Sequence, residues 1–412
     1  MPKYDVAIIG AGLGGLAAAA LLSSKNKKTI VIEQGPSLSV ALGGIEKDGF
    51  LFSAMPSLSY GFEPGGALQE FSTGLGIVQH AVVPSPCYQV ALPDHRITVF
   101  AEHEATLEEL AREFPTEIQA LSAFYRDLEK LALRTRGNRV LSYLAQLRSA
   151  AGFMGKFQFS RSLTAFFDVQ ALWFFQKPAA ALSLEAFLTL YNTPPRRLRG
   201  GFKKFGDQLC GVLLQHGGEI RYNEPSPELL FRNNRVVGVK TAHGVIVADT
   251  VIVNTQPAQN GQTLFAGLQD EVVPLGMATD VLFLPEYSRA EEVMVLSMDS
   301  REDHAVEHAG LRALTISFAS HQKVRESKNA QLEQVGRLIP FLSDFMLFAE
   351  AYEPGAGHAV LPADIVIKPL PPRGGGPICH RTSSKELFVL HDRPESPLQV
   401  ISAVRRFVKR WD

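Results

Sequence analysis

The chain has 412 residues, a length that suits two domains better than one. Apolar residues make up 46% of it and charged residues 20%, the composition of a globular protein with a sizeable core. The net charge of -1 excludes a general basic attraction for nucleic acid, and no apolar run reaches the roughly 18 residues of a membrane-spanning helix.

The cysteines indicate the compartment. Cys87, Cys210 and Cys379 lie far apart and form no CxxC pair, which argues against a disulfide framework and against a zinc site. The chain also enters an apolar strand within its first few residues, which leaves no room for a signal peptide. We therefore expect a cytoplasmic protein without a metal site.

The N-terminal segment is predicted to form a strand, a glycine turn, a helix and a second strand. Val6–Ile9 is a short apolar run typical of a buried strand, the alanine-rich stretch Leu13–Leu22 favours a helix, and Thr29–Ile32 is a second strand. This order predicts a dinucleotide-binding fold of the Rossmann type.

The glycine turn carries the sequence GxGxxG. Gly10 permits the tight turn, Gly12 lets the backbone approach a pyrophosphate, and Gly15 lets the helix pack closely on the strand. The N-terminus of the helix offers its N–H groups to phosphate. Glu33 follows the second strand, about 20 residues further on, where a carboxylate can accept hydrogen bonds from ribose hydroxyls. The motif by itself does not separate NAD from FAD.

A second glycine pair, Gly43 and Gly44, comes soon after this acidic residue. An NAD-binding unit has no use for such a pair, whereas FAD continues past the pyrophosphate into a ribityl chain and a flavin ring. Glycines without a Cβ let the backbone come close to both. The alternative is a plain surface turn.

The segment GGIEKDGFLFSAMPSL, residues 43–58, resembles the one that follows the dinucleotide fold in phytoene desaturase-like flavoproteins, relatives of the amine oxidases. The residues that match the family pattern are Gly43, Gly44, Asp48, Gly49, Phe50, Phe52, Pro56 and Ser57. Ile45 replaces the family's arginine, Ser53 its aspartate and Met55 its glycine. The resemblance implies that Met55 adds bulk near the expected flavin.

The resemblance extends along nearly the whole chain. It implies acidic helices around the step Phe114-Pro115, then the pair Gly200-Gly201 followed by a helix, a strand that returns to the first domain, and a hairpin turning at His243-Gly244. Ser226 stands where the family has a valine whose backbone faces the adenine.

The C-terminal segment matches more loosely. Asp392 aligns with the acidic residue of the family's final motif, and His391 stands in for its glycine. A helix is predicted over Pro397–Arg410, and residues 398–400 align with the backbone that addresses the cofactor at the start of this helix. Basic residues in its last turn suit the helix dipole.

The resemblance implies an FAD cofactor and the glutathione reductase-type flavoprotein fold: an α/β, Rossmann-like FAD-binding domain with a parallel sheet and a β-hairpin, and a second, α+β substrate domain. The expected FAD-binding segments are 1–95, 199–275 and 371–412, with a helical part of the substrate domain at 96–198 and its sheet and helix at 276–370. The expected cofactor-binding residues are Gly10, Gly12, Leu13, Gly14, Gly15, Glu33, Gln34, Gly43, Gly44, Pro56, Ser57, Ser226, Asp392, Leu398, Gln399 and Val400.

The substrate domain is expected to begin with helices and to end with strands. Strands are predicted over 278–284, 292–298 and 311–320, and a helix over 329–347 with a break near Pro340. The helical part holds six aromatic residues with two interpretations. They form a plain core, or they line a hydrophobic tunnel or a membrane-docking surface. These residues are Phe166, Phe167, Trp173, Phe174, Phe175 and Phe187. The basic cluster Arg196–Lys204 is either a solvated face or a contact for anionic lipid.

The sequence shows no Ser-His-Asp order, no HExxH and no paired-carboxylate signature, so no catalytic side chain is assigned. This suits a flavoenzyme, in which the cofactor carries the chemistry and the protein orients the substrate and excludes water. We expect an FAD-dependent oxidoreductase that passes a hydride from an apolar substrate, such as an isoprenoid or polyene, to flavin N5. Amine oxidation, non-redox polyene isomerisation and flavin binding without turnover stay open. The oligomeric state stays unknown.

Overall fold

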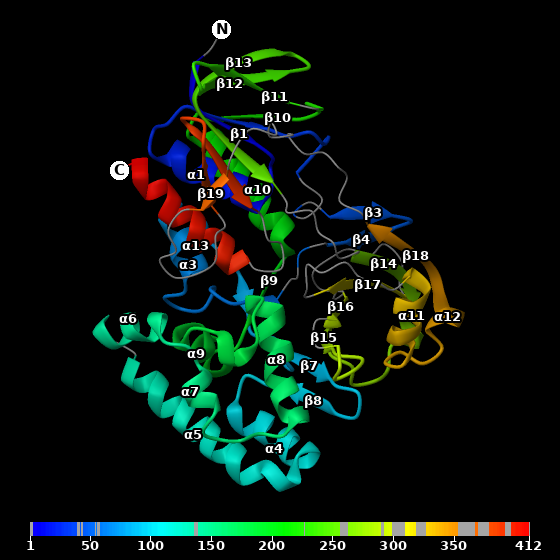
Figure 1. The fold of residues 1–412 in the computed structure, drawn as a ribbon. Coiled ribbons are helices and arrows are strands. Elements are labelled where there is room, and N and C mark those ends of the chain that lie inside the picture. The colour runs from blue at the N-terminus through cyan, green and yellow to red at the C-terminus, as the bar shows by residue number, and fades with distance from the viewer. Residues whose placement is uncertain are drawn as a thin grey trace.

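The computed structural model describes residues 3–38, 42, 44–53, 55, 58–135, 139–225, 227–255, 263–289, 292–298, 310–318, 327–352, 367–369, 379–391 and 397–411. Gly43, Pro56, Ser57, Ser226 and Asp392 lie outside the described residues. Figure 1 shows a parallel-stranded sheet with helices beside it, a second sheet, and a lobe of helices at the opposite end from the first sheet.

The first sheet runs in the order β10, β2, β1, β13, β21, β20, β19. Its strands are β1 (Lys3–Ile9), β2 (Thr29–Ile32), β10 (Glu219–Arg221), β13 (Gly244–Thr255), β19 (Ile367–Pro369), β20 (Cys379–Thr382) and β21 (Leu387–His391). The pairs from β10 to β21 are parallel, and the last two are antiparallel. Strands far apart in sequence therefore make one sheet.

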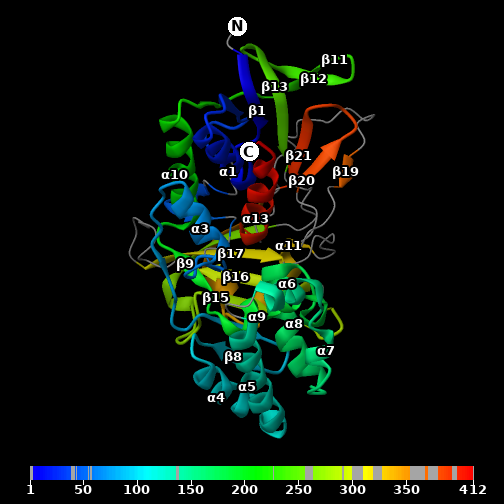
Figure 2. The same cartoon turned by 90° about the vertical axis from the view of Figure 1, so that its left-hand side faces the viewer.

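Helix α1 (Leu13–Ser24) packs against α10 (Gly201–Gln215) and α13 (Pro397–Val408), and α13 packs against α3 (Ala67–Gly74) (Figure 2). Alanines 17–20 are fully buried, because their small side chains let the neighbouring elements approach α1. The predicted helix and both flanking strands are confirmed. Helix α13 ends at Val408, and a short 3-10 turn, η5 (Lys409–Trp411), follows it.

The predicted hairpin is also confirmed. β11 (Glu228–Arg232) pairs with β12 (Arg235–Thr241), which turns at His243-Gly244 into β13. This antiparallel extension stands at the end of the first sheet that is remote from the helical lobe (Figure 1).

The second sheet runs in the order β18, β14, β17, β16, β15, β7, β8. Its strands are β7 (Tyr88–Ala91), β8 (Arg96–Val99), β14 (Thr263–Gln269), β15 (Asp280–Phe283), β16 (Met294–Met298), β17 (Leu311–Phe318) and β18 (Met346–Tyr352). Helices α11 (Lys328–Gly336) and α12 (Leu342–Phe345) contribute to the same hydrophobic cluster as this sheet. The predicted break near Pro340 is confirmed, but the predicted helical end at 346–347 is wrong, because Met346 begins β18 and pairs with Leu268.

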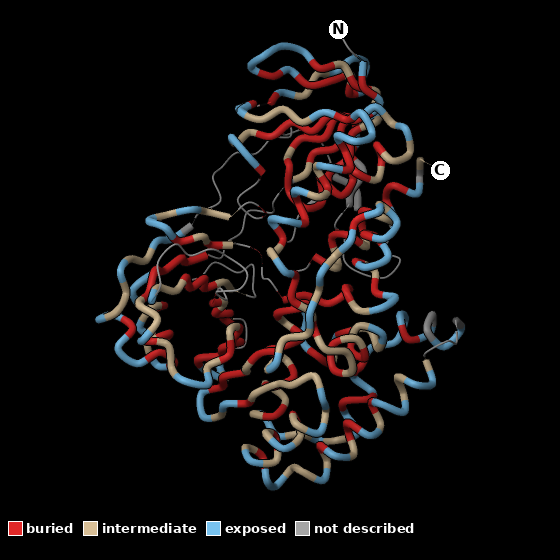
Figure 3. The backbone as a smooth tube through the Cα atoms, turned by 180° about the vertical axis from the view of Figure 1, so that it is seen from behind, coloured by how far each residue is buried: buried red, intermediate tan, exposed pale blue. Residues whose placement is uncertain are grey.

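The helical lobe contains α4 (His103–Glu113), η1 (Pro115–Glu117), α5 (Ile118–Thr135), α6 (Arg139–Leu147), α7 (Ala151–Met154), α8 (Arg161–Phe175), η2 (Ala179–Ala181) and α9 (Leu184–Asn192). Ser160 and Ser183 cap α8 and α9 by accepting the N–H groups of Leu163 and Ala186. Figure 3 shows that the residues on the inner sides of these helices are buried and that those on their outer sides are exposed.

The six aromatic residues predicted in this lobe are all buried in one hydrophobic cluster. Phe124 lies among several other rings, with Phe167 at 4.8 Å between ring centroids. Such ring pairs add to the burial of apolar surface. Their burial fits the core interpretation, and the membrane-docking interpretation is wrong for them, because almost none of their surface is exposed. The tunnel-wall interpretation stays a prediction.

The described residues also form two small sheets. β9 (Arg196–Leu198) pairs with β5 (Leu58–Ser59) and β6 (Ala81–Val82), and β3 (Ile45–Lys47) forms a hairpin with β4 (Phe50–Phe52). Asp48 and Gly49 both have positive φ, as the two-residue turn of a tight hairpin requires.

The expected segment boundaries stay a prediction. The strand pairings put β7 and β14 in the second sheet, although the expected segments 1–95 and 199–275 assign both to the first domain. β7 joins by a parallel pair with β15, and β14 lies between β17 and β18. Such long-range pairing cannot be read from the local pattern of either strand.

Candidate functional site

The glycine turn after β1 is shaped by close backbone packing. Gly10 has φ +102°, and a Cβ there would lie 2.6 Å from the carbonyl oxygen of Asn254, at the end of β13. A Cβ on Gly15 would lie 2.2 Å from the carbonyl oxygen of Gly10. Both positions therefore require glycine. Asn254 was not among the expected site residues, because only strand pairing brings it beside the turn.

Glu33 holds this turn through its carboxylate. Oε2 accepts a hydrogen bond from the N–H of Ala11 at 2.6 Å, and Oε1 accepts one from Gly35 at 3.0 Å. Its backbone N–H donates to Arg221 of β10, and its carbonyl accepts the N–H of Glu224. Glu33 is almost fully buried. These contacts give it a role in the fold that the sequence motif did not predict.

The N-terminus of α1 carries no compensating charge of its own. Its N-cap, Gly12, has no side chain to cap the helix, and the first turn holds no acidic residue. Leu13 and Gly14 are buried in that turn, and Gln34, after Glu33, is half-buried. Within the first turn of α1, no acidic side chain offsets the partial positive charge of the helix end, and the Glu33 carboxylate lies close by, at the N–H of Ala11.

Gly44 serves the β3–β4 hairpin in the structure. It has φ +77°, and a Cβ there would lie 2.6 Å from the carbonyl oxygen of Phe52. Met55, which replaces a glycine of the related family, is buried in the hydrophobic cluster shared by α1, α10 and α13. Its role as a cofactor neighbour stays a prediction.

The expected residues at the start of α13 face protein as well. Leu398 packs against the hydrophobic clusters of both the helical lobe and the first domain. The Gln399 side chain donates to the carbonyl of Phe175 at 3.3 Å, and Val400 is buried. Leu398 and Gln399 thus tie α13 to the helical lobe, whereas Val400 packs within the first domain. Their contact with a cofactor stays a prediction.

A group of buried tyrosines, absent from the sequence prediction, surrounds a cavity of about 30 Å³ in the helical lobe. Tyr60 donates to the carbonyl of Leu190 at 2.9 Å, and Tyr88 to the side-chain oxygen of Gln170 at 2.6 Å. Burial raises the pKa of both phenols well above the usual value, so they stay neutral. Nothing in their sequence spacing marks them out.

A second hollow, about 620 Å³, lies beside α5, α6 and α9 and shares Thr193 and Pro194 with the small cavity. Its charged lining residues are Glu63, Glu129, Glu185 and Arg196. The two hollows are therefore neighbours, and the larger one has a lining of mixed charge.

The basic cluster Arg196–Lys204 does not form a single solvated face. Arg197 is buried and makes an ion pair with Asp280 at the start of β15, and Ser297 donates to the same carboxylate at 2.8 Å. The solvated-face interpretation is wrong for Arg197, because its side chain is buried and its charge is paired with Asp280 inside the fold. Lys203 and Lys204 are exposed as expected.

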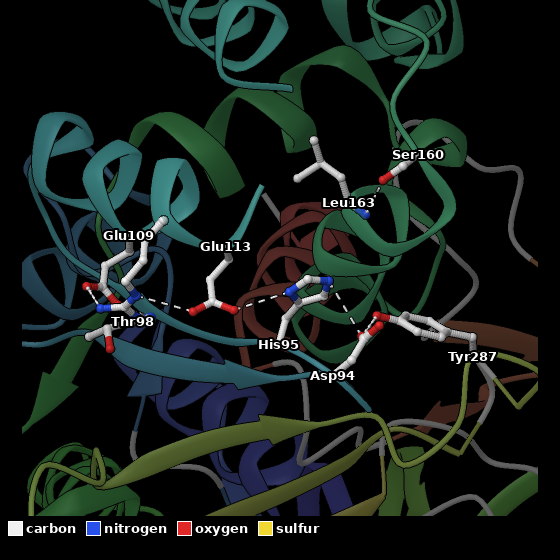
Figure 4. Close-up of polar contacts among 9 residues, drawn as sticks. Asp94, His95, Thr98, Glu109, Glu113, Ser160, Leu163 and Tyr287 are labelled. Atoms are coloured by element: carbon white, nitrogen blue, oxygen red, sulfur yellow. Dashed lines mark hydrogen bonds and ion pairs between the residues drawn. The ribbon is translucent and has the colours of Figure 1, made fainter. Parts of the chain in front are cut away.

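A polar network joins the β7–β8 turn to α4 and to the segment after β15 (Figure 4). His95 Nδ1 lies 3.2 Å from Glu113 Oε2, and its Nε2 lies 3.6 Å from Asp94 Oδ1. Tyr287 donates its hydroxyl to Asp94. Because each group already contacts another across these elements, we assign this network a structural role.

One family model, described as an NAD(P)-binding Rossmann-like domain, matches residues 8–75. Prolycopene isomerase from Daucus carota is 27% identical over 286 residues, 61% of this chain and 46% of that protein. 4,4'-Diapophytoene desaturase from Methylomonas sp is 24% identical over 270 residues, 60% of this chain and 53% of that protein. The chain thus spans about half the length of the curated relatives it matches.

Solved structures resemble the chain over nearly its whole length. An oxidoreductase from Methanosarcina mazei has a TM-score of 0.64 at 18% identity, covering 98% of this chain and 100% of its own. Rab GDI from Plasmodium falciparum has 0.66 at 13%, covering 98% and 96%, and putrescine oxidase with bound putrescine has 0.58 at 13%, covering 100% and 99%.

These comparisons confirm the expected fold class, a mixed α/β fold with a Rossmann-like domain, as in the oxidoreductase from Methanosarcina mazei and Rab GDI. Within that class, the resemblance to phytoene desaturase-like proteins and carotenoid isomerases is confirmed. Across the described residues, no helix is both long enough and apolar enough to cross a membrane.

Proposed function

We propose that the chain binds FAD, with the pyrophosphate at the N-terminus of α1. The observation that carries this proposal is the N-terminus of α1, which holds no acidic residue in its first turn and directly follows a turn that Gly10, Gly15 and Glu33 shape. The backbone N–H groups of the first helical turn would hold the phosphates. In open α/β sheets, ligands bind outside the carboxyl ends of the parallel strands, which is where this turn lies.

Glu33 would also hold the ribose in this proposal. Its two oxygens each accept one backbone N–H, but an ionised carboxylate has about four acceptor positions. It can therefore keep the turn closed and still accept a ribose hydroxyl. FAD is favoured over NAD because the chain resembles phytoene desaturase-like flavoproteins beyond the glycine motif, in the segment that begins with Gly43 and Gly44.

The proposed activity is that of an FAD-dependent oxidoreductase on an apolar substrate, with an isoprenoid or polyene as the leading class. Bound FAD would supply a hydride acceptor at N5 for a substrate C–H bond. The chain would supply orientation and exclusion of water through apolar surface such as the large cluster of the helical lobe. The names of the curated relatives, which include a desaturase of a carotenoid precursor, support this class.

A second candidate is non-redox isomerisation of a polyene double bond. It is favoured by the name of the relative from Daucus carota, prolycopene isomerase. Desaturation removes two hydrogens from the substrate, whereas isomerisation leaves its mass unchanged. Mass spectrometry of the product, after chromatographic separation of the geometric isomers, therefore separates these two functions.

The first experiment is the absorption spectrum of the purified chain, followed by anaerobic titration with dithionite and re-oxidation in air. Absorption bands at about 375 and 450 nm that bleach with dithionite and return in air indicate a redox-competent flavin. Incubation with polyenes and with amines then follows, with mass spectrometry and a peroxide assay as readouts. Peroxide formed with an amine indicates C–N oxidation, and a bound flavin that no substrate changes indicates binding without turnover. A chain that stays colourless and takes up no added FAD overturns the proposal.

A further inference from the structure

Helix α6 presents apolar side chains to solvent. Val140 is 68% exposed and Leu147 is 66% exposed, with Leu141 and Leu144 at 39% and 36%. Val140, Leu144 and Leu147 follow the spacing i, i+4, i+7, so they share one face of the helix. We call these four residues the α6 patch.

The opposite side of α6 is held by the protein. Ala145 is buried, and the Gln146 side chain donates to Glu185 of α9 at 3.0 Å. Helix α6 also packs against α5. Figure 1 places α6 at the edge of the molecule, and Figure 2 shows it on the side that faces the viewer. The α6 patch therefore lies on an outer surface, on a helix whose other side contacts α5 and α9.

The sequence around the α6 patch is strongly cationic. Residues 130–167 contain no aspartate or glutamate, although the whole chain balances 41 basic residues against 42 acidic ones. The basic residues of this stretch are Lys130, Arg134, Arg136, Arg139, Arg148, Lys156 and Arg161. Lys130 and Arg134 lie one turn apart on the exposed side of α5, with Arg126 one turn before them, and Arg148 follows α6 directly and is exposed. Two acidic residues lie close to α6: Glu185, which accepts the hydrogen bond from Gln146, and Glu129 of α5, which lines the 620 Å³ hollow together with Glu185 and Ala145.

We propose that α6 is a docking element for an anionic lipid bilayer. Exposed apolar residues on a helix flanked by basic residues bind at the boundary between headgroups and acyl chains. Each cation near such a surface strengthens binding by roughly fivefold, from the attraction to anionic lipid. The α6 patch inserts, while Lys130, Arg134 and Arg148 contact the headgroups.

A lipid surface fits better than a second copy of the chain. A two-fold dimer brings the same patch of both subunits together, so the cations around α6 would face one another. Like charges at that interface oppose association, whereas an anionic bilayer complements them. The docking element does not depend on FAD, so its test stands apart from that of the proposed function.

The test is co-sedimentation of the full chain with vesicles of phosphatidylcholine alone or of an equimolar mixture of phosphatidylcholine and phosphatidylserine. We expect binding to the mixed vesicles, little binding to the neutral ones, and release as salt rises to about 0.5 M, because the Debye length then shrinks to a few ångströms. The triple variant V140S/L144S/L147S should lower the partition coefficient at least about tenfold. The charge variant K130Q/R134Q/R148Q should lower it on the order of 100-fold.

Matched controls make the same chemical changes elsewhere on the surface. V78S/L214S/L275S removes three exposed apolar side chains, and K3Q/K203Q/K240Q removes three exposed cations. Both should bind vesicles as the wild type does, and circular dichroism checks that all four variants are folded. Equal binding to neutral and mixed vesicles, or unchanged binding by both α6 variants, overturns the proposal. Light scattering that shows a dimer of the wild type and a monomer of V140S/L144S/L147S assigns the α6 patch to self-association instead, and also overturns it.

Discussion

Replacing Glu33 should loosen the glycine turn as well as weaken cofactor binding. The N–H of Ala11 is buried and donates to the Glu33 carboxylate at 2.6 Å, and the N–H of Gly35 donates to its other oxygen at 3.0 Å. A buried donor left without an acceptor costs about 1–3 kcal/mol. Glu33→Gln keeps one oxygen and should lower the free energy of unfolding by about 1–3 kcal/mol. Glu33→Ala removes both acceptors and should cost about 2–5 kcal/mol.

The assay is urea unfolding of the cofactor-free chain, followed by circular dichroism, with FAD affinity measured separately by fluorescence titration. The control is Glu228→Gln, at an exposed glutamate on β11 of the same sheet, which should change stability by less than about 0.5 kcal/mol. If Glu33→Ala unfolds at the same urea concentration as this control, the carboxylate does not hold the turn. If Glu33→Ala loses stability but keeps wild-type FAD affinity, only the ribose role is refuted.

Three further predictions concern the packing and the pH response. Gly15→Ala puts a Cβ 2.2 Å from a carbonyl oxygen and should abolish FAD uptake in the fluorescence titration, whereas Gly211→Ala, on open helix surface, should not change it. Asp280→Asn removes the negative charge that pairs with the buried Arg197, so it should lower the free energy of unfolding by about 3–5 kcal/mol in urea. A loss below about 1 kcal/mol would contradict this. Burial pushes the pKa of Glu224 up, but hydrogen bonds, led by that of His243, outweigh it and lower the pKa. The ionised Glu224 therefore stabilises the folded chain above its ordinary pKa of 4.5, and this stabilisation is lost as the pH falls through the lowered pKa. Glu224→Gln should accordingly make the midpoint of urea unfolding fall less steeply below pH 4.5.

The local elements of the first domain could be predicted because their signals are short-range. A buried-strand run, a glycine turn and an alanine-rich helix follow one another in residues 6–22, and each is recognisable from its own composition. The hairpin at His243-Gly244 was predictable for the same reason. The end of the helix predicted over 329–347 was not, because Met346 and Leu347 suit either a helix or a strand, and pairing with β14 decides for the strand.

The roles of individual residues were harder to predict. Gly10 and Gly15 were identified as turn residues from the sequence. A side chain at either position would also meet Asn254, which follows them by more than 200 residues in sequence. Arg197 belongs to a basic cluster in the sequence, yet it is buried against Asp280 in the fold. In both cases the deciding contact comes from a strand far away along the chain.

By itself, the amino-acid sequence determined the Rossmann-like start of the chain, its resemblance to phytoene desaturase-like flavoproteins and the candidate cofactor residues, since glycine spacing and strand patterns are local. Only the tertiary structure decided which aromatic residues are core, which basic residue is paired, and that α6 carries its apolar side chains outside. The physical reason is that burial depends on what packs against a side chain, and the packing partners come from segments whose order along the chain does not reveal their distance in space.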